Sequence, residues 1–248
     1  NKKNHYFGGG INTSPFESYD YYEPRVANRY FVNPKNLGGY FYFSSNYNNK
    51  FAIDLNPYLT HVLNQNRYEA GLSISPRYRF NDRFSLVYSF DYARQQNDIG
   101  FIDFQNNDII FARRNRNTYT NAIGSKFSIS NVMNFNLSVR HYWSIAENNQ
   151  INTLNEDGSL TPNTTYTNNK NSNFSSWNLD LSYSWWFAPG SQMSILYRNN
   201  AATFDRSINK NFGSNFNNLF DDNLNHVLSI SIRYFIDYNQ AKNWIKKV

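Results

Sequence analysis

The stretch NFNLSVRHYWSIAE, residues 134–147, alternates between two kinds of side chain. The largely apolar positions are Phe135, Leu137, Val139, His141, Trp143 and Ile145. The polar positions are Asn134, Asn136, Ser138, Arg140, Tyr142 and Ser144. Because successive side chains of a β-strand point to opposite faces, this period of two predicts a strand with one apolar face. Such a face meets either the core of a soluble sandwich or the acyl chains of a membrane.

The same alternation recurs along much of the chain, clearest in residues 68–80, 84–92, 175–187 and 224–238. These predicted strands run for about 9 to 13 residues, whereas a strand of a soluble protein has about 5 to 6. A tilted strand that crosses a bilayer needs about 9 to 11 residues. Strand length therefore favours lipid over a soluble core.

The connections between the predicted strands alternate between short and long. We expect strands near residues 4–12, 38–47, 51–62, 68–80, 84–94, 118–130, 134–146, 174–187, 191–200 and 224–238. Tight turns rich in Asn, Asp, Gly and Pro are expected at 48–50, 81–83, 131–133 and 188–191. The other connections are 13–37, 63–67, 95–117, 147–173 and 201–223. A membrane meander has short periplasmic turns and long external loops, so this order predicts a periplasmic C-terminus. Pro57 and Pro76 interrupt two strands and predict a bulge or a weak ladder there.

Composition agrees with a membrane barrel. Aromatic residues make up 19% of the 248 residues, including 20 Tyr and 21 Phe, which suits aromatic girdles and polar loops. No stretch reaches the roughly 20 apolar residues of a membrane helix. The absence of cysteine excludes disulfides, thiolate zinc sites and cysteine nucleophiles. The formal charge of +6 is spread out, so we expect no nucleic-acid partner. The first residues lack the apolar core of a signal peptide, so either a signal was removed or this is a portion of a longer chain, and the direct start on a strand favours the second.

The two faces of the predicted strands assign two sets of residues. We predict that acyl chains contact Phe135, Leu137, Val139, Leu179, Leu181, Ile230 and Ile232. We predict that the lumen is lined by Arg77, Arg79, Lys126, Arg140, Arg198, Arg233, Asp54, Glu69, Asp91 and Asp180. Charges of both signs inside a barrel usually pair and brace the wall, and this interpretation is favoured. The basic excess gives the alternative, a pore that prefers anions.

Other motifs offer little chemistry. The four histidines (His5, His61, His141 and His226) lie on separate segments, which favours packed imidazoles over metal ligands. NEDGSL, residues 155–160, lacks the alternating ligands of an EF-hand and favours a turn over a calcium site. Arg113, Arg114 and Arg116 suit an anionic ligand or lipopolysaccharide phosphates, although solvated loop charges are the favoured interpretation. No nucleophile stands with a base, so we predict neither an enzyme nor a cofactor or metal site.

Several phrases resemble one protein family. They are RYFVNPKNLGGYFYFSS (29–45), RHYWS (140–144), TLNEDGSL (153–160), WWFAPGSQMSILYRN (185–199) and LSISIRYFIDY (228–238). These resemble the C-terminal region of a Bacteroidota outer-membrane family, in which an N-terminal, family-9-like carbohydrate-binding domain precedes an uncharacterised β-barrel domain. The resemblance implies that these strands are the last part of a larger barrel. The N-terminal domain is not represented in this sequence.

The sequence therefore predicts an all-β fold in which residues 1–248 form a single domain. We expect an antiparallel transmembrane β-barrel of about ten strands, the C-terminal part of a larger barrel, in a Gram-negative outer membrane. Its function would be that of a conduit for small solutes or glycans. The alternative is a non-conducting scaffold in a larger envelope complex. The expected partners are outer-membrane lipid, lipopolysaccharide and other envelope proteins.

Overall fold

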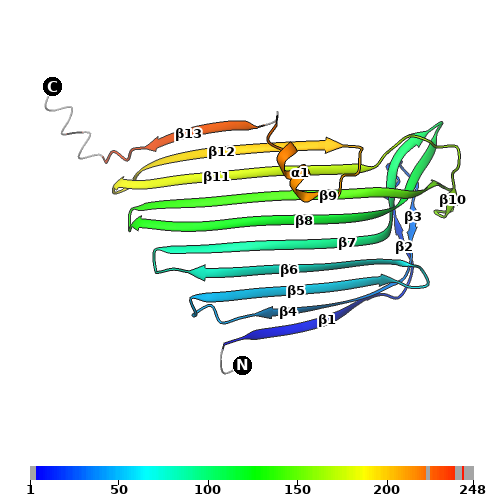
Figure 1. Ribbon diagram of the computed structural model, residues 1–248, viewed down its shortest axis with the longest axis horizontal. Helices are drawn as coiled ribbons and strands as arrows, with labels where there is room; N and C mark the ends of the chain where they lie inside the picture. The colour runs from blue at the N-terminus through cyan, green and yellow to red at the C-terminus, as the bar shows by residue number, and fades with distance from the viewer. Residues whose placement is uncertain (1–3, 222–223, 238–241, 243–248) are drawn as a thin grey trace.

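The computed structural model describes residues 4–221, 224–237 and 242, and their main feature is one large antiparallel sheet (Figure 1). The strands lie side by side in the order β1-β4-β5-β6-β7-β8-β9-β11-β12-β13, with β10 paired to β9. Their bounds are β1 Tyr6–Ser14, β4 Asn36–Ser44, β5 Phe51–Val62, β6 Arg67–Arg79, β7 Phe84–Gln105, β8 Asp108–Ser130, β9 Met133–Leu154, β10 Leu160–Pro162, β11 Ser172–Ala188, β12 Ser191–Asp205 and β13 Asn225–Arg233. The predicted all-β antiparallel meander is confirmed, and each of the ten predicted strands has its counterpart. Residue 238, the end of the last predicted strand, lies outside the described residues.

The sheet is open. Among the described residues β1 and β13 are its two edges and do not pair with each other, so closure into a barrel stays a prediction. The short turns lie together at one end of the strands, as do the start of β1 and the end of β13 (Figure 1). Asn side chains fold two of these turns: Asn46 Oδ1 accepts from the Asn48 amide, and Asn81 Oδ1 accepts from the Phe84 amide, both at 2.9 Å. Gly190, with φ of +73°, supplies the left-handed residue of a third.

The predicted long connection at 95–117 is wrong. β7 and β8 continue through this region and meet at a two-residue turn of Asn106 and Asn107, whose φ angles are 48° and 73°. Asn tolerates this left-handed backbone, which suits a tight hairpin turn. The other long connections also contain structure, because β9 runs to Leu154 and β12 to Asp205.

The pairing register sorts side chains onto two faces. Arg140 of β9 lies opposite Ala122 of β8 and Asn178 of β11, while Val139 lies opposite Ile123 and Leu179. Residues that face each other across a ladder share one side of a sheet. We call the side that carries Arg140 the polar face and the side that carries Val139 the apolar face. Every ladder of the ten-strand path preserves this division.

Two prolines stand within the sheet without shifting its register. The β4–β5 ladder has no paired residues between the Tyr40–Tyr58 pair and the Phe43–Leu55 pair, and Pro57 lies in this gap. A similar gap at Pro76 separates two stretches of the β6–β7 ladder. Each proline lacks an amide hydrogen, and a gap in one ladder lies at each, but the bulge that the sequence allowed is absent from both described strands.

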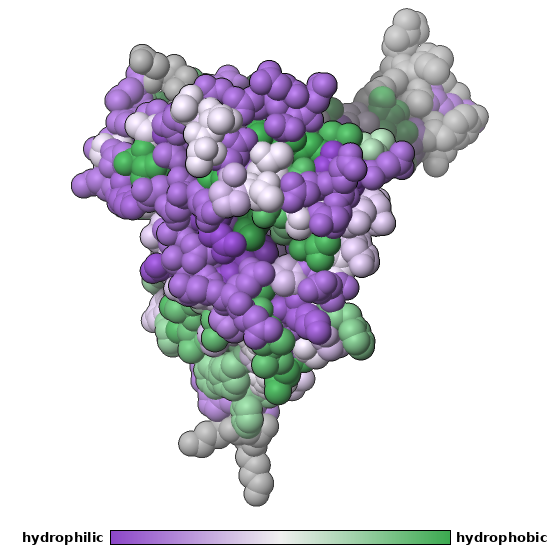
Figure 2. Space-filling model, turned by 90° about the vertical axis from the view of Figure 1, so that its right-hand side faces the viewer, coloured by the Kyte–Doolittle hydropathy of each residue, from purple (hydrophilic) through white to green (hydrophobic). Residues whose placement is uncertain are grey.

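The ends of the strands opposite the short turns carry additional structure. β2 (Ser18–Asp20) pairs with β3 (Phe31–Asn33), and Phe31 docks this pair in a buried cluster. The other buried members of the cluster are Ile99, Ile109, Phe111 and Leu154. Viewed from this end, the molecule is largely hydrophilic, with hydrophobic residues gathered toward the bottom of the view (Figure 2).

A short helix, α1 (Phe212–Asn218), crosses the sheet over β9 to β12 (Figure 1). Asn211 caps it by accepting the Ser214 amide at 2.9 Å. Phe212 and Phe216 pack edge-on against His141, and Phe216 also contacts Trp177. α1 therefore covers the apolar face, and the sequence did not predict it. Among the described residues, none belongs to a helix with the length and apolar character needed to cross a membrane.

Candidate functional site on the polar face

The structure brings each predicted set of face residues together. All ten residues predicted to line a lumen lie on the polar face, as the register of their strands shows. The seven residues predicted to contact acyl chains lie on the apolar face. The two-face division is thus a structural fact, while what each face contacts stays a prediction.

Several charges of the polar face are held by neighbours. Arg198 binds Asp180 through two hydrogen bonds of 2.7 and 2.8 Å, which hold the guanidinium against the wall. Arg77 lies over the Tyr47 ring, with 4.5 Å between Cζ and the ring centroid. Asp54 accepts from the Tyr47 hydroxyl at 2.6 Å. These contacts agree with the favoured interpretation that wall charges brace the sheet.

The remaining contacts of this kind involve Arg79 and Glu69. Arg79 donates to the carbonyl oxygen of Asn48 at 2.7 Å. Glu69 accepts from the Tyr58 hydroxyl at 2.8 Å and from Gln95 Nε2 at 3.0 Å. Both side chains are therefore fixed by neutral partners.

Four charges of the polar face are different. Asp91, Lys126, Arg140 and Arg233 make no side-chain hydrogen bond or ion pair within the described part of the chain. Arg140 lines a hollow of about 420 Å³ together with the Arg198–Asp180 pair. A charge without a protein partner is stable only where water can solvate it, which agrees with the prediction that this face is wetted.

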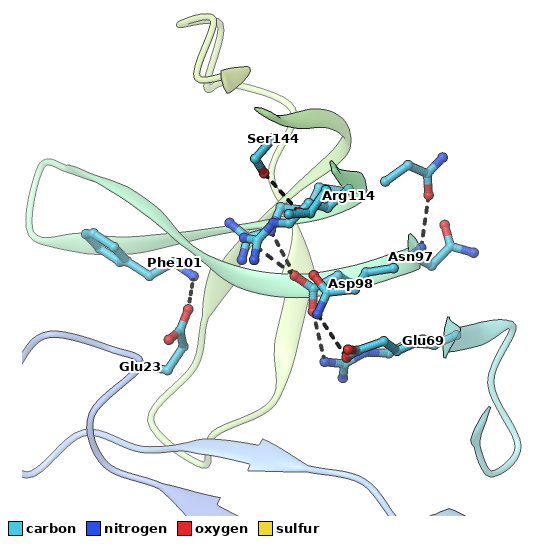
Figure 3. A network of polar contacts seen from close by, with 12 residues as sticks. Glu23, Glu69, Asn97, Asp98, Phe101, Arg114 and Ser144 are labelled. Atoms are coloured by element: carbon cyan, nitrogen blue, oxygen red, sulfur yellow. Dashed lines mark hydrogen bonds and ion pairs between the residues drawn. The ribbon is translucent and has the colours of Figure 1, made fainter. Parts of the chain in front are cut away.

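The densest polar cluster surrounds Asp98 near the far end of the strands (Figure 3). Its carboxylate accepts from Arg114 at 2.9 Å and from Arg67 at 3.4 Å, and Arg116 lies 3.9 Å away. The Arg67, Arg114 and Asp98 side chains are each only 15% exposed. Burial lowers the pKa of Arg67, an effect that the nearby Asp98 opposes. Asp98 thus holds three guanidinium groups together at a partly buried position.

A β-bulge creates this cluster. The β7–β8 register shifts between Gln95 and Asp98, and Asn97 adopts a φ of 53°. Its amide donates to Asn115 Oδ1 at 3.0 Å, which stabilises the bulge. The extra residue moves Asp98 onto the same face as Gln95 and Arg114, whereas strict alternation would point it away. The prediction that Arg114 and Arg116 are solvated in a loop is wrong, because both belong to β8 and lie against Asp98.

A second contact ties the segment between β10 and β11 to the same hairpin. Asp103, at the far end of β7, binds Lys170 at 2.8 Å and accepts from the Tyr166 hydroxyl at 2.7 Å. The hydrogen bond from Lys170 is the main reason that the pKa of Asp103 falls to about 2. The pKa of Tyr166 is raised to about 12, chiefly by burial and secondly by the hydrogen bond to Asp103. Because the pKa of Asp103 is lowered, its contacts with Lys170 and Tyr166 stabilise the fold fully above the ordinary carboxyl pKa. This stabilisation is lost as the pH falls toward 2.

Two smaller predictions are confirmed. His141 is a packed imidazole, only 3% exposed, with Nε2 3.1 Å from Ser175 Oγ and two phenylalanines against its ring. The NEDGSL segment is a turn, in which Gly158 has a φ of +77° and Asp157 accepts from the Ser159 amide at 3.0 Å. Neither arrangement offers an active site.

Comparison with known proteins identifies the family. A family model described as "Domain of unknown function (DUF5916)" matches residues 1–245, and the chain belongs to this family. This match confirms one part of the predicted resemblance, namely that the chain belongs to a family of uncharacterised domains. The bacterial group and the N-terminal carbohydrate-binding domain stay predictions. None of the curated proteins matches the chain.

Among solved structures, the chain is similar to the copper transporter OprC, with a TM-score of 0.47 and 11% sequence identity. The similarity covers 81% of this chain and 33% of that chain, so this chain spans about a third of its length.

The Asp98 cluster gives a first prediction. Asp98→Asn should destabilise the β7–β8 hairpin by about 1.5–3 kcal/mol, because three arginines lose their shared charged acceptor. Hydrogen exchange of backbone amides in residues 96–116 measures this as faster exchange. Asp91→Asn on the same strand is the matched control and should leave exchange unchanged. Equal protection in both variants would show that the cluster does not stabilise the hairpin.

Proposed function

We propose that this sheet is a section of the wall of an outer-membrane β-barrel that conducts small solutes. The apolar face contacts lipid, the polar face lines an aqueous lumen, and the short-turn end faces the periplasm. The observation that supports this best is a single-layer sheet whose two faces, built by the same strands, have opposite polarity.

The apolar face carries large side chains that nothing in the described chain covers. Leu228 and Ile232 are each 67% exposed, Ile230 is 61% exposed, and Phe51 and Leu59 are more than half exposed. A sheet normally buries its apolar face against a second layer. Among the described residues α1 covers the part of it over β9 to β12, and Phe31 of β3 packs on its far end, while most of the face has no second layer (Figure 1). A lipid bilayer supplies the missing cover for the remainder.

The height of the apolar face matches a bilayer. On β7, which lies outside the strands that α1 covers, the apolar positions run from Phe84 to Tyr92, nine residues. At about 3.3 Å per residue and a tilt of about 40°, nine residues span roughly 23 Å. The apolar band of outer-membrane barrels is about 25 Å tall. Above it the same face becomes polar, with Arg94 and Gln96 on β7.

The polar face supports a conduit. Arg140 and Lys126 lack partners in the described chain, which suits a wetted wall better than a closed interior filled by side chains. Ten strands alone enclose little more than side chains, so conduction requires more strands. The unpaired edges of β1 and β13 leave room for them on either side. The proposed barrel is therefore larger than the part seen in this chain.

The alternative function is a non-conducting scaffold in an envelope complex, and one contact favours it. Glu23, from the segment between β2 and β3, accepts the Phe101 amide at 2.8 Å and lies beside Gly100 and Arg114 (Figure 3). This segment therefore reaches the far end of the polar face, where it narrows a lumen. In either function the partners are outer-membrane lipid and lipopolysaccharide, and for a scaffold other envelope proteins.

The lipid contact is tested by two neighbouring substitutions. Leu181→Arg puts a charge on the apolar face and should cost roughly 2–4 kcal/mol of folding stability near the bilayer midplane. Ser182→Arg, one residue later on the polar face, should cost far less. Folding of the full-length protein into lipid vesicles, followed by protease resistance, measures both. Similar losses in the two variants would contradict the assignment of faces.

Planar-bilayer recordings of the full-length protein test conduction. The six basic and four acidic residues predicted for the lumen predict a modest preference for anions. Arg140→Glu should shift the reversal potential in a salt gradient toward cations, because Arg140 is not neutralised in the described chain. Arg198→Lys, which retains the charge beside Asp180, should not shift it. The absence of current across many verified insertions would remove the conduit and leave the scaffold.

A further inference from the structure

Three tyrosines of the polar face lie flat against the sheet. Tyr40 and Tyr42 on β4 lie across Gly10 and Gly8 of β1, and Tyr58 on β5 lies across Gly71 of β6. A β-carbon built on Gly10 would be 2.8 Å from the Tyr40 hydroxyl oxygen, so another residue there would displace the ring. Each ring therefore lies flat because it crosses a glycine. One ring face rests on the backbone, and the other is directed toward the polar side.

Tyr58 is the most firmly fixed of the three. Its hydroxyl donates to Glu69 Oε1 at 2.8 Å, and Gln95 Nε2 holds the other oxygen of that carboxylate at 3.0 Å. The ring nevertheless remains 37% exposed. A rigid aromatic ring that is held at one end and open on one side is pre-organised to receive a ligand, because little side-chain entropy remains to be lost.

Two hollows lie on this part of the polar face, and the lower one is the nearer to the short turns. The lower one, of about 230 Å³, is lined by Tyr58 together with Ser73, Asp91, Thr118 and Thr120. Asp91 is exposed, and its carboxylate has no partner within the described chain. Three hydroxyls and one free carboxylate thus line the same hollow as an aromatic ring.

The upper hollow, of about 170 Å³, is lined by Thr60, Arg67, Glu69, Gln95 and Asp98, among others. Gln95 Oε1 is buried and lacks a hydrogen-bond partner in the described chain. An unsatisfied buried acceptor at the edge of a hollow is a position where a ligand hydroxyl can donate. Glu69 lines this hollow and Tyr58 lines the lower one, so the Tyr58–Glu69 hydrogen bond lies between the two.

The chemistry of this site selects a polyhydroxylated, neutral ligand. An aromatic ring packs against the C–H face of a pyranose, while carboxylates and amide oxygens accept hydrogen bonds from its hydroxyls. In the lower hollow, whose lining contains no cation within the described chain, Asp91 disfavours anions through like-charge repulsion. Each hollow is smaller than the roughly 300–1,000 Å³ of a site for a drug-sized molecule, so it admits about one ring.

We propose that Tyr58, with Asp91 and Glu69, forms a binding subsite for a neutral saccharide that moves along the polar face. Tyr40 and Tyr42 continue the aromatic surface across β4 toward β1. This inference rests on the proposed conduit and names a class of solute that it carries.

The test is a pair of measurements on the full-length protein, with maltotriose, cellotriose and laminaritriose as neutral probes and trigalacturonate as an anionic one. Calorimetry in detergent measures binding, and bilayer recordings measure the block of current by each probe. At least one neutral trisaccharide should bind and block the current, and trigalacturonate should bind more weakly. Tyr58→Leu should weaken binding by about tenfold. Asp91→Asn, which removes only a free carboxylate charge, should weaken it several-fold.

Tyr78→Leu, which alters an exposed tyrosine on the apolar face, is the matched control and should leave binding unchanged. If Tyr58→Leu does not fold, Asp91→Asn still decides, because that side chain has no structural partner in the described chain. An open channel that no neutral probe binds or blocks overturns the subsite and retains the conduit. A protein that never conducts but binds a neutral probe through Tyr58 overturns the conduit and retains the subsite. Binding equal to wild type in both variants overturns the proposal.

Discussion

The structure depends on one constraint: side chains alternate across ten antiparallel strands that keep a common register. Because the ladders align Val139 with Leu179 and Arg140 with Asn178, the apolar positions of each strand add up to one continuous face. A slip of one residue in the β9–β11 ladder would place Arg140 opposite Leu179. The turns that fix this register are correspondingly local, built by Asn46, Asn81 and Gly190 with their immediate neighbours. The proposed lipid contact and lumen both follow from this division.

Several polar side chains lie on the apolar face, and each has a hydrogen-bond partner on the same face. Asn121 and Asn117 interrupt the apolar positions of β8, and each accepts a hydrogen bond from a tyrosine hydroxyl, of Tyr88 at 2.7 Å and of Tyr92 at 3.1 Å. On β12, Asn199 accepts from Trp177 Nε1 at 2.9 Å. In hydrocarbon an unsatisfied amide costs several kcal/mol, so these aromatic donors make the asparagines tolerable there. Farther from the short turns α1 covers the face, and its Asn215 accepts from the Asn173 side chain.

The fold was largely predictable from the sequence, and the candidate sites were predictable only in part. Strict alternation identified β9, β11 and β13 and assigned Arg140 and Leu181 to opposite faces. The alternation failed to predict β7 and β8 between residues 95 and 117. Side chains on both faces of that hairpin are polar or buried there, so the sequence shows no period of two. The Asn106–Asn107 pair was the available signal for a turn. The bulge at Asn97 has no such signal, so the Asp98 cluster could not be predicted. The tyrosines over Gly10 and Gly71 also escaped prediction, since a contact between strands depends on the register of both.

The central claim is that the two faces meet different media, and a scan of labelling along β9 tests it most directly. The 248 residues contain no cysteine, so single cysteines can be placed at positions 134–141 of the protein in lipid vesicles without removing native thiols from this region. The rate of reaction with a water-soluble maleimide is then measured at each position. The account predicts a period of two, with fast labelling at 134, 136, 138 and 140 and slow labelling at 135, 137 and 139. Uniform rates, or a period with the opposite phase, would contradict it.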